Sequence, residues 1–467
     1  MTTQVTGVGT ARPAAVRRTI VQRPIIQVEE KVPILKGIPL SLQHLFAMFG
    51  ASVLVPILFN AKAGTTVVDP SLVLLMNGVG TLIYLFICRG KAPAFLGSSF
   101  AFIAPTFACI AAAATPTLGF QHAVGGFTVA GLIFIIVSFI IRWAGREWLN
   151  VVLPPAAMGV IVALIGLGLA SVATDMAFSS GEKYGAHYSA GVATAISLVT
   201  LGVVVFGSLL FRGFLAALPV LMGVIVGYVL AVIINFWVPG TVNFGAIVSA
   251  PVFAMPKPVF PVYDLASILI IMPAALVVIS EHIGHLFVTS NIVGRDLLKV
   301  PGLHNSMLGD GVSTFLSSLT GSCPTTTYGE NMGVMAITRV YSVWVIGGAA
   351  VISILIAFFG DVRGFIQSIP MPVIGGISMS LFGVIAASGL RMLIEAKVDY
   401  SKSRNLLLSA IVLVIGISGV SIQIGNAQLK GMVLATLVGM GLSLIFWALD
   451  KLGLTNESPD ASMVSPD

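Results

Sequence analysis

The chain has 467 residues, of which 57% are hydrophobic and only 9% are charged. Soluble proteins carry about 25% charged residues, so this composition excludes a soluble enzyme, a nucleic-acid-binding protein and a disordered scaffold. The formal net charge of +6 does not indicate a nucleic-acid partner either, because the basic residues are scattered over short connectors. Lipid tolerates an apolar exterior, and the composition therefore favours a membrane protein with many spans.

Apolar runs follow one another between a polar amino-terminal tail (1–37) and a polar carboxy-terminal tail (451–467). At about 20 residues per crossing they predict about fourteen spans. The runs lack the period-two alternation of a barrel, so the predicted fold class is an all-α polytopic membrane protein. The predicted spans are 39–59, 71–88, 96–114, 121–141, 151–173, 192–211, 214–236, 265–290, 304–320, 323–338, 340–360, 367–390, 405–423 and 430–449.

The distribution of basic residues predicts the orientation of these spans. With the amino terminus inside, 19 of the 24 Lys and Arg residues fall in inner connectors and tails. This asymmetry follows the positive-inside rule and places both termini in the cytoplasm. It also requires an even number of spans.

Three short motifs recur seven spans apart, which indicates an inverted repeat of seven plus seven spans, as in many secondary transporters. The pairs are 153–159 with 369–375, 97–99 with 321–323, and Gln43-His44 with Glu281-His282.

Segment ten cannot be a continuous membrane helix, because residues 321–329 are rich in β-branched and helix-breaking residues. The part that can be helical starts near Glu330 and ends at Arg339. Nine residues at ~1.5 Å each cover about half of a ~30 Å hydrocarbon core, so Glu330 is placed near the midplane. Segment three mirrors this pattern, with residues 97–99 before a predicted helix from Ala101 to Ala114. Both segments are therefore predicted to be a short extended strand followed by a half-helix.

The two half-helices are predicted to point their amino termini at the membrane centre. Such ends carry unpaired N–H groups and a partial positive charge, which suit carbonyl oxygens or an anion. Gly329 allows a ligand to approach the backbone closely, and Phe100 offers an aromatic face to a planar ring. The alternative is a plain Gly-Ser loop between ordinary helices, but such a loop would not need Glu330 at its inner end.

Span eight carries Glu281, His282 and His285 inside the membrane, where ionisable residues are costly and usually functional. Glu281 and His285 are four residues apart and share a helix face, while His282 points about 100° away. A carboxylate and an imidazole in contact can share a proton, so the pair is predicted to couple protons. The alternative is a structural ion pair that ties span eight to Gln43 and His44 in span one.

Two further polar residues are given supporting roles. Asp310, near the start of span nine, is predicted to be a helix cap or a partner of the site. Asn331 is predicted to serve the packing and capping of the short half-helix. The sequence contains no nucleophile motif, phosphate loop or metal-ligand pattern, and its three cysteines have no paired spacing. We therefore expect no enzymatic activity, no metal and no cofactor.

Residues 330–339 (Glu-Asn-Met-Gly-Val-Met-Ala-Ile-Thr-Arg) resemble the signature of the nucleobase–ascorbate transporter family. In that signature an acid or Gln precedes Asn, then Gly, then Thr five positions later and a basic residue. Gln43-His44 and the helix of Glu281 are also similar to family features, and the resemblance runs from Ile38 to about Leu449. The chain is most similar to the bacterial members that carry uracil. Purine-carrying relatives typically have Gln in place of Glu330, so the acid favours a pyrimidine.

The resemblance implies a proton symporter in the bacterial inner membrane, with the proton as coupling ion, lipid as surroundings and no cofactor. It divides the chain into a core domain (38–145 and 262–361) and a gate domain (146–261 and 362–450). In this family the gate domain often forms the surface of a homodimer.

The resemblance also implies roles for the site residues. Glu281 and Glu330 would accept hydrogen bonds from ring N–H groups, and the backbone N–H groups of Phe100 and Gly329 would donate to ring carbonyls. His285 would assist proton coupling next to Glu281. Two further substrate-binding residues are expected at Tyr328 and Ala51, and supporting residues at Gln43, His44, Ser99 and Asn331.

Two rival functions stay open at this point. One is a purine (xanthine or urate) proton symporter. The other is an inorganic anion exchanger or channel of the same architecture, because such proteins hold anions at half-helix ends. Two central carboxylates would repel an anion, which disfavours the second rival.

Overall fold

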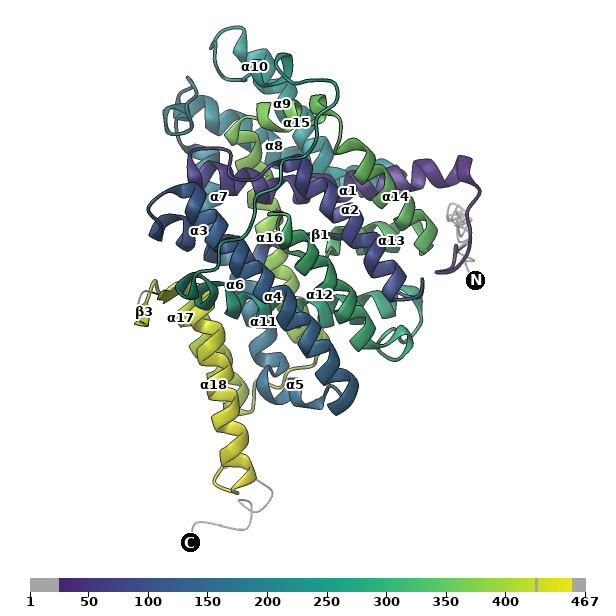
Figure 1. Cartoon of the computed structure of the whole chain (residues 1–467), viewed down its shortest axis with the longest axis vertical. Helices are drawn as coiled ribbons and strands as arrows, with labels where there is room; N and C mark the ends of the chain where they lie inside the picture. The colour runs from purple at the N-terminus through teal and green to yellow at the C-terminus, as the bar shows by residue number, and fades with distance from the viewer. Residues whose placement is uncertain (1–24, 425–426, 456–467) are drawn as a thin grey trace, which may run out of the picture.

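Long apolar helices make up most of the chain (Figure 1). The computed structural model describes residues 25–424 and 427–455, and within these ranges eight helices are long and apolar enough to cross a membrane. These helices are α1 (Ile34–Ala63), α2 (Pro70–Ile87), α4 (Pro116–Ala144), the pair α6 (Pro155–Gly168) and α7 (Ala170–Phe178) as one span, α8 (Ala190–Leu210), α11 (Leu265–Val293), α16 (Met371–Glu395) and α18 (Gly431–Lys451). The predicted class of all-α polytopic membrane protein is confirmed.

The remaining segments are shorter. They are η1 (Phe100–Phe102) with α3 (Ile103–Ala112), α9 (Pro219–Asn235), α12 (Leu303–Leu319), α13 (Gly329–Thr338), α14 (Val343–Ile356) and α17 (Ser403–Ile417). Small connecting helices are α5 (Glu147–Val152), η2 (Gly181–Tyr184), η3 (Leu215–Ala217), α10 (Gly245–Val248), η4 (Leu298–Gly302) and α15 (Gly360–Ser368). Each predicted span thus has a helical counterpart, while the number of crossings and the inverted repeat stay predictions.

Two predicted spans differ from the structure. The span at 151–173 is interrupted, because Pro154 lacks an N–H and the helix restarts at Pro155. The span at 405–423 was wrong at its end, since α17 stops at Ile417 and a hairpin of β3 (Ser421–Ile424) and β4 (Ala427–Lys430) follows. Gly419 has a φ of 73°, which lets the chain leave the helix and turn into that hairpin.

The helices pack in two groups. Helices α1, α2, α4, α11, α12 and α14 pack mainly on one another, and α6, α7, α8 and α16 form a second set. Glycines bring helices of the second set close together: a Cβ on Gly166 would lie 2.0 Å from the carbonyl oxygen of Phe382 in α16. This confirms the close helix packing that we expect of such small residues in a membrane protein.

Two short strands pack on helices of the first group, β1 (Leu96–Ser98) on α1 and α2 and β2 (Thr325–Thr327) on α11 and α12. β1 pairs antiparallel with β2, with Gly97 opposite Thr326. Further backbone bonds extend the pair, from Ser99 N–H to the oxygen of Pro324 (2.9 Å) and from Tyr328 N–H to that of Phe95 (3.1 Å). Irregular backbone is tolerated at membrane depth only where protein satisfies it, as here. The predicted strand and half-helix in segments three and ten are confirmed, although residues 321–323 precede β2 and do not belong to it.

The predicted tail at 1–37 is partly structured. Residues 25–33, which we term the N-terminal strap, pack on the bundle, and residues 1–24 lie outside the described residues. The strap pairs Ile26 with Val340, ahead of α14, and buries Val28 completely. Glu29 of the strap contacts Arg295 in the turn after α11 at 2.6 Å. The strap therefore joins the ends of the α11 and α13 segments.

We expect Glu29→Gln to lower stability by less than about 1 kcal/mol, because the pair with Arg295 is exposed. The hydrogen bond from Arg295 holds the pKa of Glu29 below its usual value. The Glu29–Arg295 pair therefore contributes its full stability above the pKa that Glu29 has in the unfolded chain. This contribution disappears as pH falls through the lowered pKa that Glu29 has in the folded state. Thermal unfolding in detergent at pH 7 and at pH 3.5 measures it, with Glu30→Gln as control. If the stability difference between the wild type and Glu29→Gln were equal at both pH values, the charge of Glu29 would have no stabilising role.

Candidate functional site

Two carboxylates come together on neighbouring helices. Glu281 lies near the middle of α11, whose first turn is capped by Asp264 through bonds to the N–H (2.8 Å) and Oγ (2.7 Å) of Ser267. These bonds lower the pKa of Asp264. Glu330 lies in the first turn of α13, which packs on α11, so the two acids are within electrostatic range of each other. Oε2 of Glu281 is buried and has no hydrogen-bond partner among the described residues.

Two open backbone amides begin short helices that pack on α11. Phe100 begins η1 and Gly329 begins α13, and neither N–H has an acceptor in the described part of the chain. A Cβ on Gly329 would meet only Met332 (3.7 Å) and Nε2 of His285 (3.9 Å), so the backbone there is open to a ligand. Unpaired N–H groups at a helix start are donors for a carbonyl oxygen.

An aromatic cluster borders the amides. The rings of Phe100 and Tyr328 are stacked, with centroids 6.4 Å apart and planes at 18°. The Tyr328 hydroxyl donates to the carbonyl oxygen of Ser98 at 2.9 Å, which fixes its ring. Phe382 of α16 packs its edge on Phe100 at 6.0 Å. Phe382 could not be predicted from the sequence, because a Phe in an apolar helix carries no signal of its own.

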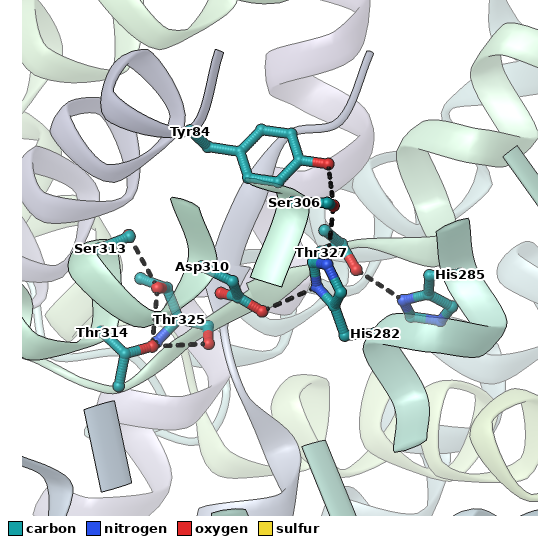
Figure 2. Close-up of polar contacts among 9 residues, drawn as sticks. All are labelled: Tyr84, His282, His285, Ser306, Asp310, Ser313, Thr314, Thr325 and Thr327. Atoms are coloured by element: carbon teal, nitrogen blue, oxygen red, sulfur yellow. Dashed lines mark hydrogen bonds and ion pairs between the residues drawn. The ribbon is translucent and has the colours of Figure 1, made fainter. Parts of the chain in front are cut away.

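His285 has a different partner from the one we expect. Its Nδ1 lies 3.0 Å from Oγ1 of Thr327 in β2 (Figure 2), and no described hydrogen bond joins it to Glu281. No hydrogen bond or ion pair therefore joins the side chains of Glu281 and His285 among the described residues, and the role of the pair in proton coupling stays a prediction. β2 passes alongside α11 and offers a hydroxyl within reach of the imidazole, and sequence spacing on one helix could not reveal this.

The residues predicted in span one hold the second half-helix. Nδ2 of Asn331 donates to Nδ1 and to the backbone oxygen of His44, both at 3.2 Å. Gln43 donates to the carbonyl oxygen of Phe214, near η3, at 3.3 Å. The alternative of an ion pair between spans eight and one is therefore wrong, because span one is bonded to α13 instead.

Two predicted residues make no polar side-chain contact in the described part of the chain. Ala51 is fully buried in α1, next to Ser52, whose carbonyl oxygen accepts from Oγ of Ser98 at 3.2 Å. Ser99 is also fully buried between β1 and η1, and its hydroxyl has no partner among the described residues.

Asp310 does not cap a helix, because it lies inside α12. It is instead a partner of His282, whose Nδ1 is 3.0 Å from Oδ2 of Asp310, while Nε2 is 2.8 Å from Oγ of Ser306. Tyr84 of α2 completes this chain of contacts, with its hydroxyl 2.8 Å from the same Oγ (Figure 2). Sequence analysis missed Tyr84 and Ser306, because nothing in the sequence brings α2 to α12.

We expect Asn331→Ala to reduce stability by about 1–3 kcal/mol, because it leaves Nδ1 of His44 buried without a donor. It should also weaken ligand binding, since α13 loses its anchor to α1. Thermal unfolding and ligand titration of the purified variant measure both effects, and Asn235→Ala, at the last residue of α9, serves as control for binding. Unchanged values for Asn331→Ala would show that the anchor is dispensable.

Two cavities border α11. One, of about 420 Å³, is lined by Phe100, Ile270, Leu164 and Met432. The other, of about 490 Å³, is lined by Ser280, Gly284 and Met392. No group of three or more His, Cys, Asp or Glu side chains that could hold a metal occurs within the described ranges.

Comparison with known proteins identifies the family of the chain. The model of the "Permease family" matches residues 35–425. The chain belongs to this family. The permease is therefore a multi-pass membrane transporter and not an enzyme, and its resemblance to the nucleobase–ascorbate transporter family is confirmed.

Curated relatives are similar over nearly their whole length. The permease is 55% identical over 430 residues to a protein named "Uracil permease" from Escherichia coli, which covers 92% of this chain and 96% of the relative. It is 52% identical over 435 residues to the "Uracil permease" of Paenibacillus larvae, covering 93% and 99%.

Solved structures share the fold. The mouse Slc26a9 structure, described as an anion transporter in the inward-facing state, superposes with a TM-score of 0.66 and 13% identity. The match covers 90% of this chain and 69% of the mouse chain. At this identity the likeness concerns the fold of the permease alone.

Proposed function

We propose that the permease imports uracil, or a closely related pyrimidine, together with protons across the bacterial plasma membrane. The observation that carries the proposal is the grouping of the carboxylates of Glu281 and Glu330 with the open amides of Phe100 and Gly329. The printed names of relatives at 55% and 52% identity support the choice of uracil.

Uracil alternates N–H donors and C=O acceptors around its edge, and two acids with two amides complement that pattern. Glu281 and Glu330 accept from the ring N–H groups, and the amides of Phe100 and Gly329 donate to the ring oxygens. An analogue that leaves one of these buried groups unpaired loses about 1–3 kcal/mol of binding, which provides selectivity. The planar ring lies against Phe100 and Tyr328.

Proton coupling follows from the cost of buried charge. An ionised carboxylate inside a membrane is expensive unless it is paired, and no Lys or Arg among the described residues contacts Glu281. Proton uptake by Glu281 removes this cost, and the protonated carboxyl keeps a carbonyl oxygen that accepts a ring N–H, so the proton and the base are carried together. His285, beside Gly329, assists the transfer.

Alternating access is supported by two separate cavities along α11, one lined by Phe100 and Ile270 and the other by Ser280 and Gly284. We assign movement to the gate domain (146–261 and 362–450) against the core domain (38–145 and 262–361). Both termini are placed in the cytoplasm, and a homodimer through the gate domain is part of the proposal.

Binding and uptake assays in proteoliposomes test this function. Labelled uracil is competed with thymine, xanthine and cytosine at pH 5.5 and pH 7.5, with and without a proton gradient. We expect uracil to compete best and accumulation to require the gradient. Preference for xanthine would favour the purine rival, and gradient-independent movement of chloride or bicarbonate would favour the anion rival.

A further inference from the structure

A chain of buried polar side chains lies behind the proposed uracil site and has no part in holding the base. His282, Ser306 and Asp310 are connected by the contacts of 2.8 Å and 3.0 Å shown in Figure 2, and all three side chains are fully buried. The hydroxyl of Tyr84, also fully buried, ends the chain at 2.8 Å from Ser306. The four residues come from α2, α11 and α12.

The negative charge of this chain is not balanced by a strong cation. Asp310 contacts His282, but its second oxygen, Oδ1, has no hydrogen-bond partner in the described part of the chain. No Lys or Arg of the described residues forms an ion pair with it. A carboxylate in that position is costly unless a proton accompanies it.

Few titratable groups face His282 and Asp310 from the elements that pack around them. α2 contributes Tyr84 and Cys88, and α11 contributes Glu281 and His285. β2 contributes only threonines, and the ionisable residues of α4, which also packs on α12, are confined to its ends at 122 and 142. Glu281 is thus the nearest acid that shares this environment.

A small cavity of about 10 Å³ separates the two histidines. Its polar lining includes Tyr84, His282, His285, Ser306 and Thr327. This is close to the smallest space that holds one water molecule, and a water needs two to four polar partners, which this lining offers.

We propose that His282 and Asp310 form a second proton-binding site of the transport cycle, reached from His285 through this cavity. The inference rests on the proposed function. In the empty state Nδ1–H of His282 donates to the Asp310 carboxylate, Nε2 accepts from the Ser306 hydroxyl, and the network carries one negative charge. A proton arriving from the cavity forms an O–H bond on Ser306 as Ser306 passes its own proton to Nε2. The product is an imidazolium next to a carboxylate, with no net charge.

This step links proton binding to base binding. When the His282–Asp310 pair has taken up a proton, the surroundings of Glu281 carry one negative charge less. The electrostatic cost of ionised Glu281, which accepts a ring N–H, is then lower. Uracil and the proton at His282 therefore favour each other. Affinity for uracil should rise as pH falls, until the pair is filled.

The decisive variant is Asp310→Asn, which keeps the shape of the side chain and removes the negative charge that stabilises a protonated His282. Wild-type uracil affinity should change at least about 10-fold between pH 5.5 and pH 8, and that of Asp310→Asn less than about threefold. Uptake against a gradient should fall at least about 10-fold, while uracil exchange without a gradient stays within about threefold. His282→Asn cannot take up a proton and should show the same loss of pH dependence and of uptake against a gradient. It replaces Asp310→Asn in the test if that variant does not fold.

Thr128→Val, a buried hydroxyl in α4 outside the network, is the matched control and should keep the wild-type pH profile. The wild-type profile in Asp310→Asn, or loss of binding at every pH in both variants with reduced thermal stability, would overturn the proposal. If wild-type protein binds no uracil, the proposed function fails on its own. The pair is then judged by ¹⁵N NMR of labelled histidine: an imidazolium signal absent from Asp310→Asn supports it, and no such signal in wild-type protein overturns it.

Discussion

Glu281→Gln should abolish concentrative uracil uptake, with a loss of at least about 100-fold, equivalent to about 2.7 kcal/mol. Gln has the same shape but cannot take up or release a proton. Its amide also turns one of two acceptor atoms into a donor, which faces a ring N–H in the proposed pose. Both effects act on a side chain that has no other partner for Oε2 among the described residues.

Initial uptake rates in proteoliposomes with an inward proton gradient measure this loss. Glu182→Gln, in the exposed turn η2, removes a charge of the same kind away from the site and should transport normally. Near-normal proton-driven uptake by Glu281→Gln would refute the coupling role of this acid. Uracil exchange without a gradient separates the loss of coupling from the loss of binding.

The intramembrane acids and the broken segments could be predicted from the sequence because both violate strong physical rules. Glu281 and Glu330 are charged residues in lipid-length segments, where their cost demands a function. Residues 321–329 cannot form a helix, and the structure has β2 and the start of α13 there. Intramembrane acids and broken helices can be recognised from the local sequence alone.

The partners of these residues could not be predicted, because they come from distant segments through ordinary side chains. Thr327 binds His285 only because β2 pairs with β1, and Phe382 reaches Phe100 only because α16 packs beside the core helices. The spacing of Glu281 and His285 on one helix predicted a polar contact between them, whereas the described hydrogen bond of His285 goes to Thr327. Which partner a side chain contacts depends on the tertiary structure.

The crossing of β1 and β2 depends on a glycine that the sequence does not single out for this reason. A Cβ on Gly97 would lie 2.3 Å from the ring atoms Cε2 and Cζ of Tyr328. That ring cannot move freely, because it stacks on Phe100 and its hydroxyl is bound to Ser98. Both proposed amide donors, at Phe100 and Gly329, lie within a few residues of this contact.

Gly97→Ala should therefore weaken uracil binding at least about 10-fold and destabilise the protein by about 1–3 kcal/mol, as expected for a methyl group forced into a packed site. Equilibrium binding and thermal unfolding of purified protein measure the two effects. Gly441→Ala adds the same methyl group in α18, where a Cβ meets nothing within 4 Å, and should leave both values near wild type. Because Tyr328 directly precedes the amide of Gly329, normal binding by a folded Gly97→Ala protein would mean that the ring does not fix this donor. The position of the Gly329 amide would then depend on the hydrogen bond between Asn331 and α1 alone.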